Sequence, residues 1–570
     1  MQIKIVNAQN SDRKRVYLVE AYRIGKKVKQ RIVKKYGNLL DLQKDDPDIL
    51  IKLKDEAKRL TKEKKDNIIP MILDLNTSNA SSSNPINIGC VYLSSLFDSL
   101  SLDSVINTID AEERYQYDFY DVLKFLVIMR IIDPGSKKRS YERRGRLFLD
   151  FDLSQDDLYR SLTVMERYRH RFIRHLDRHM TASYGRDKTL VYYDVTNYYF
   201  ESNRTSELRK VGPSKDHSQH PIVSMGLYID NNNYPITYDL FEGNVHDSKT
   251  LIPSFENIRE ELGIEKCIVV ADKGLNSGTN IKYLLDSGHG YIFSSKIRGQ
   301  SGPLIERALD PENYHVIDKN FKYKRFQFTR KAKYKDEQGK DHTFDLTENM
   351  IVFHSANYDR KAKHEREQLL EKLQYYLENP DRLKQRTKQG KLKYLKQKEY
   401  DPKTGEIIES KVALDIDQDK IEKDERLDGY YLIATSELDM KGEEIIERYR
   451  GLWAIEQSFR IIKNELEGRP IHVSTDDHIR GHFFTCFMAL MIERMLEHRL
   501  SSVLEPGTAL SAEKVQEALQ DMNVLMIEKD IYKIMKYSNL QKKIQEVFEH
   551  GVIDKEYIRK EHLIQHLKKV

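Results

Sequence analysis

The sequence predicts an α/β protein in which a mixed sheet carries helices on its faces. Three segments with the apolar or alternating pattern of strands follow one another from Lys188, namely TLVYYDVTNYYFE, PIVSMGLYID and YPITYDLFEG. Helical and strand-like segments then alternate up to residue 297, as in sheets that are covered by helices. We therefore expect the order βββαβαβ, with helical regions before and after it.

The composition is that of a globular protein with several domains. The chain has 570 residues, of which 39% are hydrophobic and 32% charged, and this length suggests about three or four domains. Its apolar runs are too short to cross a bilayer, and its charged start lacks the apolar segment of a signal peptide, so we expect a cytoplasmic protein without membrane contact. Three cysteines exclude a disulfide scaffold. The net charge of +5 is too small to identify a partner.

Residues 1–73 are expected to form a small basic unit. Residues 16–33 have the pattern of a hairpin with its turn at Ile24 and Gly25, and a charged helix is expected over 48–65. The Ser- and Asn-rich stretch LNTSNASSSNPIN cannot bury enough apolar surface to hold one conformation. We therefore predict a linker at 74–88.

Residues 89–185 have helical periodicity and are predicted to form a DNA-binding domain. The prediction depends on basic residues interleaved with Tyr141, Tyr159 and Tyr168, because guanidinium groups suit phosphate contacts. A solvated helix face is the alternative. The basic residues are Lys137, Lys138, Arg139, Arg143, Arg144, Arg146, Arg167, Arg169, Arg171, Arg174 and Arg178.

The sheet is expected in two pieces, 186–298 and 429–478. Residues 299–428 between them are irregular and strongly charged, with short strand-like pieces such as YKRFQFTR and NMIVFHS, so we predict an inserted β-rich subdomain. Residues 479–570 are expected to be helical. The other predicted elements are helices at 250–262, 278–286 and 441–466, and strands at 267–272, 290–297 and 430–436.

Two aspartates stand at the ends of apolar strands. Asp194 ends LVYYD, and Asp272 ends CIVVAD 78 residues later. Carboxylates in such positions meet in the crevice of an α/β sheet. Each aspartate alone is more often a turn residue or a helix cap, so a catalytic reading needs a third acid.

The helix expected at 441–466 offers this third acid. An apolar stripe of core residues runs along it, and a second stripe, about 80° away around the helix, borders the first. The second stripe contains Tyr449, Glu456 and Lys463, which repeat every seven residues. Glu456 could therefore reach the two aspartates, with Tyr449 and Lys463 on either side. A solvated Glu/Lys row is the alternative.

These residues together resemble a known family. DVTNYYFE at 194–201, FEGNVHDSKTL at 241–251, ADKGLNS at 271–277, and the spacing of Tyr449, Glu456 and Lys463 are similar to bacterial insertion-sequence transposases of the DDE class that carry the Y-R-E-K signature. The resemblance extends from about 185 to 490. It implies an RNase H-like catalytic core, interrupted by the insertion at 299–428.

The resemblance also implies the chemistry. Asp194, Asp272 and Glu456 would be the catalytic acids and would hold two ions of Mg²⁺ or Mn²⁺, since carboxylate oxygens suit these metals. Tyr449 and Lys463 would contact DNA phosphates. Leu452 stands where the signature has arginine, so Arg450 and Arg460 are candidates for that contact. Lys273 replaces an arginine common after the second acid, which keeps the charge and loses the bidentate fork.

The leading hypothesis is a transposase that binds the terminal inverted repeats of its element and target DNA as a homodimer, and cuts and joins the strands. A nuclease with the same fold, or a catalytically inactive DNA-binding repressor of the element, are the alternatives. His478, His482 and Cys486 fall at i, i+4 and i+8 of one helix and could ligate zinc, but we prefer a packed helix face because no fourth ligand is evident. Asn244, His246 and Asp247 could support the metal site or form a turn.

Overall fold

The computed structural model divides into two compact units, 1–82 and 83–570, which are described separately. The predicted hairpin turn at Gly25, most of the predicted linker at 74–88 and the Lys-rich run at 379–393 lie outside the described residues. The structure describes residues 1–7, 14–24, 27–66, 84–113, 116–212, 220–378, 394–398, 413–505, 510–528, 530–548, 553 and 555–568.

The N-terminal unit is a three-stranded antiparallel sheet with two helices. The predicted hairpin is confirmed and is longer than expected, because β2 (Lys14–Ile24) pairs with β3 (Lys27–Asn38) over most of their lengths. The sequence did not indicate β1 (Gln2–Asn7), which pairs with the other side of β2, nor α1 (Leu39–Asp45). The predicted charged helix is α2 (Ile49–Asp66). Its Leu53 and Ala57 are buried, as are the strand residues Val16, Leu18 and Val19.

The second unit begins with the predicted helical block. The most apolar of its helices is α5 (Phe119–Ile132), which Asp118 caps at its start and which ends just before Pro134. It is almost entirely buried. The other helices of the block are α3 (Gly89–Asp98), α4 (Asp103–Glu113), α6 (Lys137–Arg143), α7 (Gln155–Arg167) and α8 (Arg169–Tyr184), with a short 3₁₀ turn, η1, at Arg144–Arg146.

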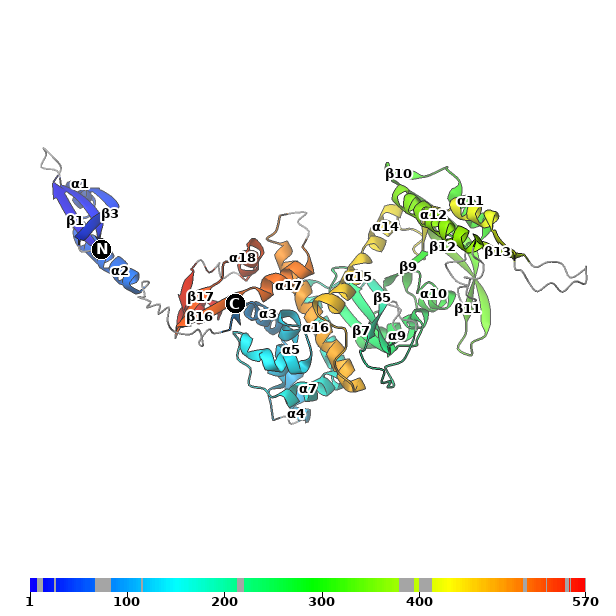
Figure 1. Cartoon of the computed structure of the whole chain (residues 1–570), viewed down its shortest axis with the longest axis horizontal. Coiled ribbons are helices and arrows are strands. Elements are labelled where there is room, and N and C mark those ends of the chain that lie inside the picture. The colour runs from blue at the N-terminus through cyan, green and yellow to red at the C-terminus, as the bar shows by residue number, and fades with distance from the viewer. Residues whose placement is uncertain are drawn as a thin grey trace, which may run out of the picture. The chain divides into compact units, whose positions relative to one another are not determined.

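A nine-stranded mixed sheet forms the centre of the second unit (Figure 1). The strand order is β10-β11-β12-β15-β9-β8-β5-β6-β7. Strands β5, β8 and β9 are parallel to one another, and every other neighbouring pair is antiparallel. The predicted order βββαβαβ is confirmed by β5 (Leu190–Tyr199), β6 (Ile222–Asp230), β7 (Pro235–Glu242), α9 (Leu251–Leu262), β8 (Ile268–Ala271), α10 (Gly278–Asp286) and β9 (Gly290–Ser295).

The two faces of β5 pack against different elements, because successive side chains of a strand point to opposite faces. Val191, Tyr193 and Val195 belong to a core shared with α9 and α10. Tyr192 and Tyr198 belong to the core on the other face, which includes α15 (Trp453–Arg460) and α16 (Asp476–Ser501). The even-numbered residues of β5 therefore face the helix that carries Glu456.

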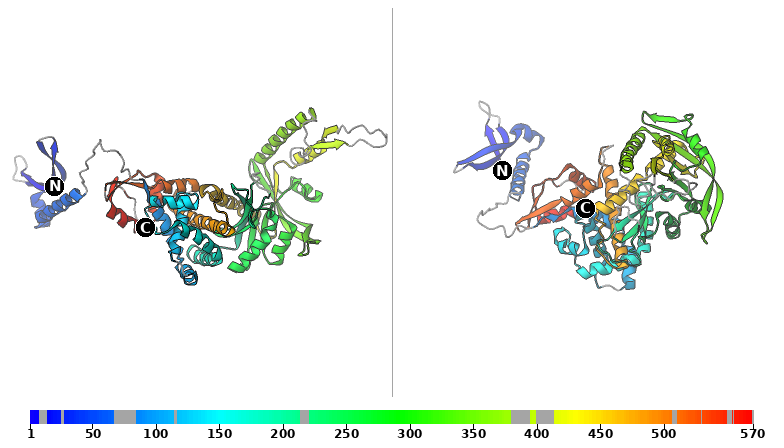
Figure 2. Two further views of the ribbon diagram at one scale, coloured as in Figure 1. Left: turned by 60° about the horizontal axis from the view of Figure 1, so that its bottom comes forward. Right: turned by 45° about the vertical axis from the view of Figure 1, so that its right-hand side comes forward.

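The segment at 299–428 extends the same sheet. Its strands β10 (His315–Asp318), β11 (Phe321–Lys335) and β12 (Asp341–Ser355) continue the sheet beyond β15 (Tyr430–Thr435), which itself pairs with β9. The two strand-like pieces of the sequence are parts of β11 and β12, which pair along their whole length. The views in Figures 1 and 2 place these strands and the helical block at opposite ends of the sheet. The segment also contains α11 (Gly302–Leu309), α12 (Ala356–Glu378), the strand pair β13 (Leu395–Lys398) and β14 (Ala413–Ile416), and α13 (Gln418–Glu425).

The prediction that residues 479–570 are helical is wrong in part. A small antiparallel sheet of order β18-β17-β16-β4 lies among α17 (Ala512–Gln520), α18 (Asn539–Glu546) and α19 (Lys560–Leu567). Its strands are β4 (Ile86–Asn87), β16 (Asn523–Glu528), β17 (Ile531–Ile534) and β18 (Tyr557–Arg559). Asp530, between β16 and β17, has a φ of 71°, a turn conformation that ends the first strand and starts the second.

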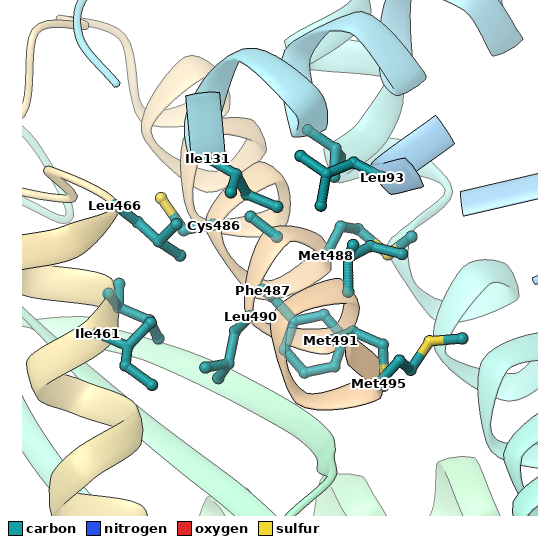
Figure 3. Packing of buried hydrophobic residues seen from close by; sticks show 14 of the residues in the cluster. Leu93, Ile131, Ile461, Leu466, Cys486, Phe487, Met488, Leu490, Met491 and Met495 are labelled. Atoms are coloured by element: carbon teal, nitrogen blue, oxygen red, sulfur yellow. The ribbon is translucent and has the colours of Figure 1, made fainter. Parts of the chain in front are cut away.

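Helix α16 forms the centre of the helical core. Almost all of its residues between Ile479 and Leu496 are buried. Figure 3 shows Phe487, Leu490 and Met491 of this helix among side chains from other segments, including Leu93 and Ile461. In the described parts of the chain, no helix is both long and apolar enough to cross a membrane.

Candidate active site

Asp194 and Asp272 stand at the same level on neighbouring parallel strands. Tyr192 of β5 is paired with Val270 of β8, and each aspartate follows two residues later. Asp194 is on the face of β5 that packs against α15, because it lies two residues after Tyr192 and four before Tyr198, and side chains at even spacings share one face of a strand. The register of β5 and β8 therefore brings the two predicted acids together.

The turn after β8 holds the carboxylate of Asp272. The backbone N–H of Gly274 donates to Asp272 Oδ1 at 2.6 Å. Asn276 in the same turn donates from Nδ2 to the carbonyl oxygen of Ser294 at 2.9 Å, which ties the turn to β9. Both aspartates are half-buried, so one side of each carboxylate is open to solvent or to a ligand.

The predicted continuous helix at 441–466 is wrong. Helix α14 (Gly442–Arg450) ends before Gly451, α15 follows, and the last turn, η5 (Ile461–Glu465), is a π-helix. The ring of Tyr192 lies where a Cβ on Gly451 would stand, and its hydroxyl donates to the carbonyl oxygen of Arg448 at 3.0 Å. Gly451 and Leu452 between the two helices keep right-handed helical backbone angles. Because the last turn is a π-helix, a regular angle of 100° per residue does not hold between Tyr449 and Lys463.

Tyr449 nevertheless lies beside all three predicted acids. Burial raises the pKa of the Tyr449 phenol. Hydrogen bonding to Ser294 opposes this shift, and the negative charges of Asp272, Glu456 and Asp194 add to it. Three carboxylates contributed by β5, the turn after β8 and α15 thus act on one phenol, which stays neutral at physiological pH.

A cavity of about 670 Å³ opens next to this group. Glu456, Tyr449, Arg450 and Lys273 all line it, and Glu456 is exposed. The guanidinium of Arg450 lies 5.6 Å from the ring centre of Phe321. Arg460 is not part of this lining in the described chain. It acts instead on Glu465, whose pKa burial raises and the charge of Arg460 lowers.

Lys463 lies against the same face of β5. Its Nζ donates to Thr196 Oγ1 at 2.5 Å and lies 5.5 Å from the ring centre of Tyr198. Thr196 stands two residues after Asp194 and shares its face. The sequence analysis missed Thr196, although its place two residues beyond an aspartate in a strand could have drawn attention to it.

The site contains the oxygen donors for a divalent cation. Three carboxylates offer the ligands that Mg²⁺ and Mn²⁺ prefer. In the part of the chain that the structure describes, no three His, Cys, Asp or Glu side chains are close enough together to hold a metal ion. The oxygen donors therefore suit such a metal in their chemistry, while the three carboxylates together are not close enough in this structure to hold an ion.

Other predicted groups have structural partners. His482 is buried and its Nε2 lies 3.2 Å from the carbonyl oxygen of Gly468 and 3.8 Å from Cys486 Sγ, while the ring of His478 packs against Tyr159. His246 Nδ1 accepts a hydrogen bond from the backbone N–H of Ser248 at 3.4 Å, and so caps the short helix η2 (Asp247–Lys249).

The prediction that Lys137 and Arg169 contact DNA is wrong, because both side chains are buried. Lys137 is 2% exposed and Arg169 9% exposed. Arg169 donates to the carbonyl oxygen of Tyr238 on β7 at 3.0 Å. Both residues are part of the packing between elements, and phosphate groups of DNA do not reach such positions.

Carboxylates on neighbouring strands of a mixed sheet, with a third on an adjacent helix, are an arrangement that suits metal-dependent phosphoryl transfer. The model of the transposase DDE domain family matches residues 186–492, and the chain belongs to this family. The N-terminal domain of the IS1634 family of transposases matches residues 3–68. The protein is thus a DDE-type transposase of an insertion sequence, an enzyme that depends on a divalent metal and acts on DNA.

Among the solved structures to which the chain is similar is one described as "Cryo-EM structure of piggyBac transposase synaptic complex with hairpin DNA (SNHP)". The two chains share 10% sequence identity with a TM-score of 0.33, over 77% of this chain and 82% of the other. No curated protein matches the chain.

Proposed function

We propose that Asp194, Asp272 and Glu456 are the catalytic acids of this transposase. The observation that carries the proposal is their common position around Tyr449, which all three reach with their charge. The matched register of β5 and β8 supports the pairing of the two aspartates. Glu456 is exposed on α15, so its side chain is free to turn toward the aspartates.

We assign the metal site to the same three carboxylates and expect two ions of Mg²⁺ or Mn²⁺. Such ions would activate the attacking oxygen and stabilise the leaving oxygen of a phosphodiester. Asp194 on β5, Asp272 after β8 and Glu456 on α15 would together hold these ions. A second set of residues would orient the DNA by binding its phosphates, namely Lys463, Tyr449, Arg450 and Lys273. Arg460 becomes the weaker candidate, because it acts on Glu465.

The strand order supports an RNase H-like core. Strands β7-β6-β5-β8-β9 form three antiparallel strands followed by two parallel ones, and the acids lie on the central strand and its parallel neighbour. We assign this core to 186–298 and 429–478, the insertion to 299–428 and DNA binding to 1–73 and 89–185. We further propose that the protein acts in the cytoplasm as a homodimer on the terminal inverted repeats.

The test is cleavage of a labelled duplex that carries the terminal repeat, with Mg²⁺ or Mn²⁺. We expect Asp194→Asn, Asp272→Asn and Glu456→Gln each to lower the cleavage rate by about 10⁴-fold, the scale of losing a catalytic carboxylate, while DNA binding persists. Glu447→Gln is the matched control, because Glu447 is exposed on the neighbouring α14 and does not line the cavity.

Three outcomes would contradict the proposal. If any one of the three variants kept the wild-type cleavage rate, that residue would not be a catalytic acid. If the wild type bound DNA and gave neither a cleaved nor a joined product, the chain would be a DNA-binding repressor. Cleavage without any joined product would indicate a nuclease.

A further inference from the structure

A second cavity lies between α4, α8 and the end of α9, and it shares no lining residue with the first. Its volume is about 490 Å³. Three arginines of α8 line it, Arg171, Arg174 and Arg178, and α4 contributes small hydroxyl side chains to the opposite wall. The arginines recur at intervals of three and four residues, so they lie along one face of the helix.

The four arginines of α8 differ in their partners. Arg169 is buried against β7, as described above, and Arg171 Nη1 forms an ion pair with Glu112 at 2.8 Å. Arg174 and Arg178 only donate long hydrogen bonds of 3.4 Å from Nε to carbonyl oxygens of their own helix. Within the described residues, no carboxylate forms an ion pair with either of them, and both side chains are exposed.

The two carboxylates in the lining have partners other than these arginines. Asp177 is buried and accepts from Arg186 Nη1 at 3.2 Å and from Lys188 Nζ at 2.6 Å. Glu261 is half-buried, and its Oε1 lies 2.9 Å from Nδ1 of His170. Within the described residues neither carboxylate forms an ion pair with Arg174 or Arg178, whose guanidinium groups stand on the open side of the cavity.

We propose that this cavity is a binding site for the sugar-phosphate backbone of duplex DNA, with Arg174 and Arg178 each contacting a phosphate. Guanidinium groups bind phosphate oxygens with two parallel hydrogen bonds, and the pair presents positive charge one helical turn apart along an open groove. The proposal rests on the action of the transposase on DNA. It adds a contact surface outside the active site, one that fixes the position of the DNA without reading its sequence.

The test measures the affinity of the full-length protein for two duplexes by fluorescence anisotropy at several salt concentrations. One duplex carries the terminal repeat and the other is unrelated and of equal length. We expect the variant Arg174→Ala/Arg178→Ala to bind both duplexes more weakly by similar factors. Its plot of log affinity against log salt concentration should be shallower by about 1.8, since each lost phosphate contact removes about 0.9 from the slope.

Two control variants show whether a change in DNA affinity comes from the two arginines in the groove, from the total charge of the protein or from a loss of folding. The variant Arg160→Ala/Lys514→Ala removes two exposed cations outside the groove and should keep the wild-type slope. Arg174→Lys/Arg178→Lys keeps both charges and should keep most of the slope as well. The arginine variants should unfold at the same urea concentration as the wild type, because both side chains lie on the helix surface.

The outcomes distinguish this proposal from the wider function. A wild-type slope in the Arg174→Ala/Arg178→Ala variant, or weakened binding of the repeat duplex alone, would overturn the backbone site and leave the catalytic proposal intact. Failure of the wild type to bind either duplex would overturn both. Loss of cleavage in the Asp194→Asn protein with an unchanged salt slope would support the acids and the groove as separate sites.

Discussion

Glu493 is a buried acid in the middle of α16. It is 4% exposed, and among the described residues neither of its carboxylate oxygens has a hydrogen-bond partner. The neighbouring Arg494 donates instead to Glu497 and to Ser458. Burial raises the pKa of Glu493 well above its usual value, and the charge of Glu497 raises it further. The folded protein therefore holds the proton of this carboxyl group more tightly than the unfolded chain does.

We expect Glu493→Gln to stabilise the protein at neutral pH. Because the folded pKa is raised, the unfolded chain loses its proton first, and the free energy of unfolding falls as the pH rises above about 4.5. The fall is at most about 1.4 kcal/mol per pH unit and ends at the folded pKa. Glutamine keeps the shape of the side chain and cannot ionise, so the free energy of unfolding of the variant should not show this decrease with pH. Urea denaturation between pH 4 and pH 8 would measure it.

Glu497→Gln is the matched comparison for Glu493. Glu497 Oε2 accepts from Arg494 at 2.6 Å, so its loss leaves a buried guanidinium less well paired and should destabilise the protein. If the free energy of unfolding depended on pH equally in the wild type and in Glu493→Gln, the pKa of Glu493 would not be raised by folding, and the prediction would be wrong.

Among elements, the break between α14 and α15 determines where Glu456 stands. The Tyr192 ring occupies the space beside Gly451, so this position has no room for a side chain. Helix α15 begins at Trp453, carries Glu456 in its first turn and packs against β5, the strand of Asp194.

We expect Gly451→Ala to destabilise the protein by about 1–3 kcal/mol, the usual effect of overpacking, and to lower DNA cleavage more than DNA binding. The added methyl group would push α15 and Glu456 away from β5. Urea denaturation and cleavage of the repeat duplex measure the two effects. Gly302→Ala in α11 is the control, because a Cβ there meets nothing within 4 Å. If Gly451→Ala behaved like the control, the close approach would have no structural role.

The sequence predicts elements whose pattern is local and misses those that depend on distant contacts. Strand ends are local, so Asp194 and Asp272 could be placed before the structure was known. The close approach at Gly451 involves Tyr192, 259 residues earlier in the chain. Similarly, β16 pairs with the two-residue strand β4, more than 430 residues before it. The short alternation of apolar and polar residues in β16 lies between helical segments and did not stand out in the sequence. The register that aligns Asp272 with Asp194 could not be deduced without the pairing of β5 and β8.

On the scale of the whole molecule, buried tyrosines distinguish the central sheet. Tyr193, Tyr198, Tyr228, Tyr238 and Tyr291 are almost completely buried. Burial is the first cause that raises the pKa of each of these phenols. The folded protein therefore holds these protons more tightly than the unfolded chain does.

We expect the stability of the second unit to fall at alkaline pH. Each phenol leaves the free energy of unfolding unchanged below the unfolded pKa of about 10 and lowers it by at most about 1.4 kcal/mol per pH unit above that pKa. Five such groups make the fall steep. Urea denaturation between pH 8 and pH 11, together with phenolate absorbance, measures it. If these tyrosines gave phenolate absorbance near pH 10 while the sheet stayed folded, the prediction would be wrong.

The pairing of β9 with β15 has a consequence for the order in which the protein is made. Ser295 and Leu432 are partners in the sheet, so the ribosome must add β10, β11, β12 and α12 before the strand that completes this ladder exists. Glu456 follows 184 residues after Asp272, which is about 10–40 s of synthesis at ordinary rates. During this interval the growing chain has both aspartates without the glutamate. With Glu456 as the proposed third acid, catalytic competence is thus one of the later properties that the nascent transposase acquires.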